Sequence, residues 1–247
     1  MAAMQAAHTA ISNNLANIGT PGYKQDIPQT EQFNNIFVTL LDVHLGLGNV
    51  DTTTEIVGET GGGTQLLPLL LDLTQGSLRA TGRPLDLGLA AAGFLTVDTG
   101  GGSLAYMRGG SLRRSDDGTI TDQSGNRVLD IAGNPITLPS GDVVFNSDGT
   151  ITGADGDLGQ LAIVDLADGQ AWTKVGGNLF LPADPLTPPT QVADPQVRQG
   201  FLEFSNVNAV DQFAEMLSTM RVFQAAGTML ELLDSTQEAT AQTVGSV

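Results

Sequence analysis

The sequence contains no cysteine, few aromatic residues and few basic residues. Without cysteine, disulfide bonds and thiol chemistry are excluded. Ten lysine and arginine residues stand against 27 aspartate and glutamate residues, which gives a formal net charge of −17. A surface of that sign repels phosphate groups. We therefore expect neither nucleic acid nor an anionic membrane surface as a partner.

Long apolar segments are also missing. The apolar run 66–73 is interrupted by Pro68 and Asp72 and is too short to cross a bilayer. The N-terminus has neither the basic segment nor the apolar core of a cleavable secretory signal. We therefore expect no direct insertion into a membrane.

Residues suited to catalysis or metal binding are equally sparse. His8 and His44 are the two histidines, and they lie in different parts of the sequence, which argues against a zinc site and a Ser-His-Asp set. The Asp-Gly turns lack the closing glutamate of a calcium loop, and the glycine run 58–64 lacks the lysine of a phosphate loop. We predict no enzyme activity, catalytic residues, small-molecule substrate, cofactor or metal.

Charged side chains are absent from residues 1–23, although this stretch has the apolar spacing of a helix. Met4, Ile11 and Ile18 are seven residues apart, and Leu15 lies on the same stripe. The pattern predicts a helix over 2–18.

Asn14 lies at the edge of that stripe on a helical wheel, and the outer faces carry Asn13 and Asn17 where an ordinary surface helix carries glutamate or lysine. Amides are cheaper to bury than charges if they find hydrogen-bond partners. The uncharged faces therefore indicate a helix surrounded by protein. The alternative is a frayed polar terminus that packs against nothing.

The middle of the chain, 66–181, alternates short apolar segments with turn-forming residues, which is typical of an all-β module. The stretches 116–125 and 147–156 resemble one another and predict two similar hairpins. A proline-rich stretch follows at 182–198, and we expect it to be an extended linker.

A second helical pattern covers 206–243. Its apolar residues alternate three and four apart, which favours a helix that packs on other helices. Arg221 is the one charged residue between Met216 and Leu230. A frayed tail would not carry such a stripe, so this pattern favours the buried alternative for both ends.

The predicted fold is mainly β with helical termini, in which the N- and C-terminal helices pair as a coiled coil and enclose a turn-rich β domain. The expected parts are an N-terminal axial helix and signature, a variable connecting segment, the β domain, the linker and a C-terminal axial helix. Their ranges are 1–24, 25–65, 66–181, 182–198 and 199–247.

Three stretches also carry a family resemblance. "SNNLANIGTPGYK", 12–24, and "QGFLEFSNVNAVDQFAEMLSTMRVFQA", 199–225, resemble the N- and C-terminal signatures of bacterial flagellar rod, hook and hook-associated axial proteins. "DLTQGSLRATGRPLDLGLAAAGFLTV", 72–97, is similar to the segment that leads into the β domain of the rod proteins. Alanines replace the usual asparagine-and-glycine turn at 90–93, which leaves that turn undefined.

Within the family, 158–182 is most similar to the FlgF group of proximal-rod proteins, with the FlgG group of distal-rod proteins as the close alternative. The resemblance implies a subunit exported by the flagellar type III apparatus. It would polymerise with copies of itself and neighbouring rod proteins into a helical tube in the periplasmic part of the basal body. That tube transmits torque from the motor to the hook.

This role and the uncharged faces together define a predicted assembly interface. Its residues are Met4, Ile11, Asn13, Asn14, Leu15, Asn17, Ile18, Phe213, Met216, Leu217, Met220, Phe223 and Leu230. Two alternatives remain: a hook-type axial subunit of the same family, and a secreted β-rich binding or adhesive module with oligomerising helices.

Overall fold

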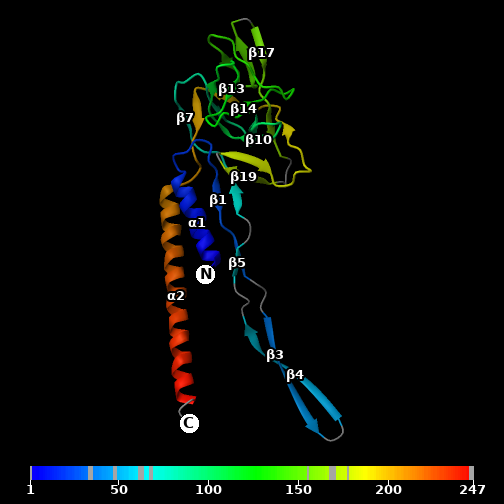
Figure 1. Cartoon of the computed structure of the whole chain (residues 1–247), viewed down its shortest axis with the longest axis vertical. Coiled ribbons are helices and arrows are strands. Elements are labelled where there is room, and N and C mark those ends of the chain that lie inside the picture. Colours follow the sequence, from blue (N-terminus) through cyan, green and yellow to red (C-terminus); the bar gives the residue numbers. More distant parts are fainter. Residues whose placement is uncertain are drawn as a thin grey trace. The chain divides into compact units, whose positions relative to one another are not determined.

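The computed structural model describes residues 2–32, 36–46, 49–60, 64–66, 69–154, 156–166, 171–176 and 178–244. The chain forms two compact units (Figure 1). Unit 1 consists of Met1–Ser12, Ile27–Leu70 and Ala214–Val247, and unit 2 consists of Asn13–Asp26 and Leu71–Phe213. Strands dominate the described residues and a helix lies near each end, as the sequence predicts.

Unit 1 contains most of the two helices, α1 (Ala2–Ala16) and α2 (Ala209–Val244). The expected helices over 2–18 and 206–243 are therefore confirmed to within three residues at each end. α2 begins after Asn208, whose Oδ1 accepts a hydrogen bond from the backbone N–H of Val210 at 3.0 Å. This is an N-cap, and Asp211 adds a negative charge in the first turn, where the helix dipole favours it.

Unit 1 also contains two pairs of antiparallel strands. β2 (Thr30–Gln32) pairs with β5 (Thr64–Leu66), and β3 (Ile36–Gly46) pairs with β4 (Asn49–Thr60). The stretch expected as a variable connection thus contains long paired strands. Within the described residues, neither helix has the length and apolar character needed to cross a membrane.

Unit 2 is built around a nine-stranded sheet. Its main path is β12 (Arg113–Arg114), β13 (Ile120–Thr121), β14 (Arg127–Val128), β9 (Phe94–Asp98), β10 (Leu104–Met107), β20 (Leu179–Pro182) and β19 (Trp172–Gly176). β18 (Ile163–Asp165) pairs with both β9 and β21 (Thr190–Gln191). The proline-rich stretch 182–198 therefore contributes β21 to this sheet.

Smaller sheets complete unit 2. β8 (Asp86–Leu89) lies between β11 (Gly109–Ser111) and β22 (Val197–Gln199), and β16 (Thr150–Gly153) lies between β15 (Val144–Phe145) and β17 (Gly156–Gln160). Two strand pairs bring the terminal stretches to the β region: β1 (Gln25–Ile27) with β6 (Leu70–Asp72), and β23 (Phe201–Glu203) with β7 (Leu78–Ala80).

The central sheet buries both of its faces. On β9, Leu95 and Val97 belong to a large aliphatic cluster, whereas Phe94 belongs to a separate aromatic cluster with Tyr106 and Trp172. Successive side chains of a strand point to opposite faces, so this division places a core on each side. The strand therefore has apolar residues on both of its faces, at Phe94 on one and at Leu95 and Val97 on the other.

The two predicted similar hairpins are confirmed. In each turn one aspartate, Asp117 or Asp148, accepts hydrogen bonds from the backbone N–H and the hydroxyl of the threonine two residues later. The intervening glycines have φ of 84° and 86°, a conformation that glycine adopts without strain. These bonds also lower the pKa of both carboxyl groups, the threonine contacts being the largest cause.

Candidate functional site

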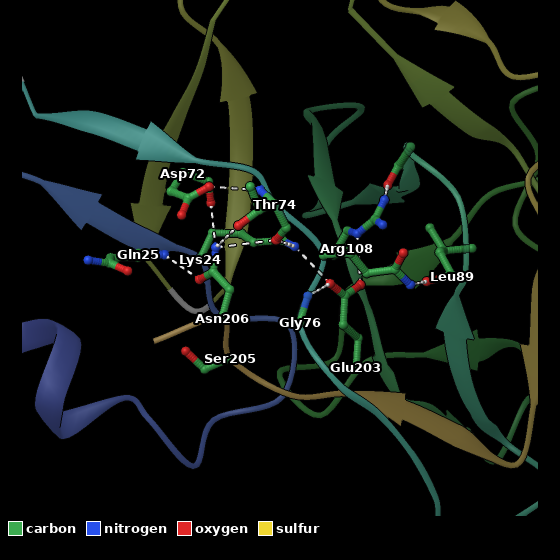
Figure 2. Close-up of polar contacts among 12 residues, drawn as sticks. Lys24, Gln25, Asp72, Thr74, Gly76, Leu89, Arg108, Glu203, Ser205 and Asn206 are labelled. Carbon is green, nitrogen blue, oxygen red and sulfur yellow. Dashed lines mark hydrogen bonds and ion pairs between the residues drawn. The ribbon is translucent and has the colours of Figure 1, made fainter. Parts of the chain in front are cut away.

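The two terminal signatures and the central stretch that resembles the family meet in unit 2 at one buried carboxylate (Figure 2). Glu203 lies at the end of β23, and its side chain is 1% exposed. One oxygen, Oε1, lies 2.7 Å from the Lys24 ammonium and accepts the backbone N–H of Gly76 at 2.9 Å. The other, Oε2, accepts Nε–H of Arg108 at 2.8 Å. We call Lys24, Glu203 and Arg108 the ionic junction.

The ionic junction contains two cations and one anion, and all three side chains are at most 4% exposed. Lys24 also donates to the backbone oxygen of Thr74 at 2.7 Å. Burial lowers the pKa of Lys24, and the hydrogen bond to Glu203 opposes that shift. Removal of Glu203 would leave two buried charges without the carboxylate that bonds to both of them.

Arg108 extends the junction to the turn at 90–93. Its guanidinium donates to the backbone oxygens of Gly93 and Ala91. The turn that the sequence left undefined is thus held by a charged side chain. Gly93 has φ of 133°, and a Cβ there would lie 3.0 Å from the side chain of Ile163. Glycine is therefore required at this position by both conformation and space.

A second set of contacts joins the same stretches. The Oδ1 of Asn206 accepts the backbone N–H of Gln25 at 2.9 Å, and its Nδ2 donates to the backbone oxygen of Asp72 at 2.9 Å. Close by, the backbone at Gly76 passes so near to Phe204 that a Cβ would lie 1.8 Å from its carbonyl oxygen. The two terminal signatures therefore contact 72–76 through hydrogen bonds to the backbone and through the close approach of the backbone at Gly76. A larger residue than glycine would not fit there.

A third contact set surrounds Asn14, which is 0% exposed. Its amide bonds to Tyr23, Asp26 and Gln212. Lys174 reaches the same place from β19: its ammonium lies 2.8 Å from Asp26 Oδ2 and 3.8 Å from the centroid of the Tyr23 ring.

The predicted interface residues of the N-terminal helix divide into two groups. Ile11 and Asn14 have no exposed surface, so both side chains pack inside the subunit. Their part in the assembly interface stays a prediction. Asn13 is exposed, and the others, Met4, Leu15, Asn17 and Ile18, are half-buried.

The predicted residues of α2 are mostly on its surface. Met216 is half-buried, and the rest are 42–57% exposed: Phe213, Leu217, Met220, Phe223 and Leu230. Further large apolar residues that the stripe did not include are also exposed, namely Val210, Val222, Met229, Leu232 and Leu233. Exposed apolar side chains thus lie on several faces of α2.

In unit 1 the two helices lie side by side and share a groove of about 300 Å³ (Figure 1). Met4 and His8 line it from α1, and Met220 and Phe223 line it from α2. The structure therefore brings together three of the predicted interface residues. The remaining ones lie outside this groove.

Among the described residues, no group of three or more His, Asp or Glu side chains is placed to hold a metal ion. The charged groups of the ionic junction form hydrogen bonds to one another and to backbone atoms.

Sequence reasoning missed the ionic junction. Two local signals pointed to it. Lys24 is the first charged residue of the chain, and Glu203 is the one glutamate between Glu59 and Glu215.

Three segments match known protein families. Residues 1–24 match the family described as "Flagella basal body rod protein", and residues 89–153 match "Flagellar hook protein FlgE/F/G D1 domain". Residues 198–243 match "Flagellar basal body rod FlgEFG protein C-terminal".

Several curated proteins are similar over nearly the whole chain. The flagellar basal-body rod protein FlgF of Escherichia coli K12 is 32% identical over 236 residues, 90% of this chain and 86% of its own length. The flagellar basal-body rod protein FlgG of Bacillus subtilis 168 is 30% identical over 246 residues, 91% of this chain and 88% of its own length. Because both groups match at similar identity, the FlgF assignment stays a prediction.

Proposed function

This chain belongs to the family of flagellar basal-body rod proteins, which makes it a structural subunit of the bacterial flagellum basal body, and we propose that its two helices form part of the rod wall. In this proposal the subunits assemble helically into a tube that transmits torque, and the β-rich unit 2 faces outward. The relatives are rod proteins along nearly their full length, which disfavours a secreted adhesive module.

The surface of α2 is the observation that carries the proposal. Large apolar side chains remain exposed from Val210 to Leu233, and Arg221 is the one charge between Met216 and Leu230. Monomeric proteins rarely leave contiguous apolar surface of this kind in water. Pairing with α1 covers one side of the helix, and we propose that neighbouring subunits cover the others as coiled coils.

Self-association of this type requires an open, head-to-tail arrangement. A helical tube forms when one surface of a subunit binds a different surface of the next subunit and the contacts do not close into a ring. The partners are then further copies and neighbouring rod proteins. On the resemblance of 158–182, we propose the FlgF class and delivery to the periplasmic rod through the flagellar type III export apparatus.

The ionic junction supports the mechanical part of the proposal. A rod subunit must carry load between its terminal segments and its β region. Charge-assisted hydrogen bonds are stronger than neutral ones, and here they join 24, 108 and 203 in a site without water access. The junction therefore provides a stiff connection where both signatures enter unit 2.

Two variants test the function. Met220→Asp and Leu15→Asp each place a charge where the assembled rod would exclude water, at a cost of several kcal/mol per subunit. We expect electron microscopy of basal bodies from cells carrying either variant to show no completed rod, whereas circular dichroism of the purified chain keeps its β signal. Leu186→Asp, at an 88% exposed residue of unit 2, is the matched control. Normal rods in the Met220→Asp strain would refute the proposed wall.

A further inference from the structure

The amide of Asn14 uses its full hydrogen-bonding capacity inside unit 2. Its Nδ2 donates to Gln212 Oε1 at 3.0 Å and to the backbone oxygen of Asp26 at 2.8 Å. Its Oδ1 accepts the backbone N–H of Asp26 at 2.9 Å and the hydroxyl of Tyr23 at 3.1 Å. An asparagine side chain has two donor hydrogens and two acceptor lone pairs, so all four are occupied.

These four bonds lie where the chain passes between its two units. It does so after Ser12, after Asp26, after Leu70 and after Phe213. Asn14 and its partners Asp26 and Gln212 lie within two residues of three of these points, and the pairing of β1 with β6 joins the second to the third. One buried side chain therefore contacts three of the segments that leave unit 2.

A buried polar side chain with fixed hydrogen-bond partners favours one register of a helix over its neighbours. Apolar contacts such as those of Ile11 accept a small shift with little loss, because dispersion forces are not directional. A shift of α1 by one residue rotates it by 100° and turns the Asn14 amide away from its partners. Buried donors and acceptors would then be unsatisfied, at a cost for each. A single buried asparagine sets the register of coiled coils for the same reason.

We propose that Asn14 is a positioning residue that fixes the register of α1 against α2. The bond to Gln212 joins the two helices directly, and the bonds to Tyr23 and Asp26 anchor that pair to unit 2. Both helices continue without a break into unit 1. A register set at Asn14 therefore determines which residues of α2 face Met4 and His8 in the groove.

Cysteine crosslinking tests the proposal, because the chain has no cysteine of its own. A cysteine at Gln5, which lines the groove, is combined in turn with a cysteine at Leu217, Met220, Gln224 or Thr228. In the otherwise unchanged chain we expect disulfides at the two groove positions, Met220 and Gln224, and little at Leu217 or Thr228.

The same scan is then repeated with Asn14→Leu, and with Asn13→Leu as the matched control at the exposed neighbour. With Asn14→Leu we expect the ratio of groove to off-groove disulfides to fall by about fivefold, since one lost hydrogen bond changes an equilibrium by about that factor. Asn13→Leu should leave the ratio unchanged. Lower stability alone would reduce all yields together without changing this ratio.

Gln212→Leu keeps the proposal testable if Asn14→Leu unfolds unit 2. It removes the bond between the helices and leaves the bonds of Asn14 to Tyr23 and Asp26 in place. An unchanged ratio in this variant, with unit 2 folded, would overturn the proposal. This readout is independent of the proposed function, whereas a motility defect in the same variants would rest on it.

Discussion

The carboxylate of Glu203 lies 2.7 Å from the ammonium of Lys24, although 179 positions separate the two residues along the chain. This pair joins the N-terminal signature to the C-terminal one, and Arg108 joins both to the central sheet. The site has one more positive than negative charge. Stability should therefore depend more on the single anion than on either cation.

Glu203→Gln should be strongly destabilising. The amide keeps the shape of the side chain but removes the carboxylate that bonds to both Lys24 and Arg108, at a cost of about 3–5 kcal/mol. Urea unfolding followed by tryptophan fluorescence measures the change, because Trp172 is buried in unit 2. Glu231→Gln, at an exposed residue of α2, is the control and should change the free energy of unfolding by less than about 0.5 kcal/mol.

Lys24→Met should cost less than Glu203→Gln. It leaves Glu203 paired with Arg108 and removes the hydrogen bond to Thr74, a loss of about 1–3 kcal/mol. Equal losses for the two variants would show that charge balance does not govern the ionic junction.

Both tyrosines should resist ionisation in the folded chain. Burial raises the pKa of Tyr23 and of Tyr106, and the neighbouring Asp26 raises that of Tyr23 further. A group with a raised pKa in the folded state contributes stability below its unfolded value of 10.0, and that contribution is lost as the pH rises further. Phenolate absorbance near pH 10.5 should therefore be low in the native chain and should appear on unfolding in urea.

The matched variant for the titration is Tyr106→Phe. It leaves Tyr23 as the sole tyrosine. We expect Tyr23 to ionise at a higher pH than Tyr106, because it also faces Asp26. Phenolate formation near pH 10 in the native variant would contradict the burial of Tyr23 against Asn14.

A glutamate-specific protease should reveal unit 2 as a two-segment core. Glu203 is the one glutamate of unit 2 and is buried, whereas Glu31, Glu55, Glu59 and Glu215 belong to unit 1. We expect cleavage at the unit 1 sites while Glu203 is protected. The N-terminal fragment that contains Asn14 and Lys24 should stay bound to the fragment 60–215 during gel filtration.

Two results would contradict this division of the chain. Early cleavage at Glu203 would mean that the ionic junction is open in solution. Release of the N-terminal fragment under native conditions would mean that 13–26 is not part of unit 2. Denaturant should separate the two fragments and provides the control.

Local patterns predicted the helices and the hairpins but not the contacts that join them. The spacing of Met4 and Ile11 and the Asp-Gly turns are properties of neighbouring residues, and each structure follows from them. The ionic junction depends on three residues brought together by tertiary folding, which periodicity does not record. The helical wheel placed Asn14 at the edge of the apolar stripe, whereas the structure buries it because Tyr23, Asp26 and Gln212 supply its partners.

The exposed Asn13 tests why α1 carries no charge. Asn14 is satisfied inside the chain, and Asn17 donates to the backbone oxygen of Asn13 and accepts the hydroxyl of Thr20, so both have local reasons to be asparagine. Asn13 is exposed, and lysine there should change the free energy of unfolding by less than about 0.5 kcal/mol. In a packed tube the same lysine would place an unpaired charge between subunits, and like charges would repeat along the wall.

We therefore expect Asn13→Lys to block rod assembly and swimming while the purified chain unfolds at the same temperature as the unmodified one. Asn13→Gln, which lengthens the side chain without adding charge, should swim and serves as the control. Swimming cells with Asn13→Lys would place this face of α1 in water after assembly. The absence of charge from 1–23 would then require a cause within the subunit, as it already has at Asn14.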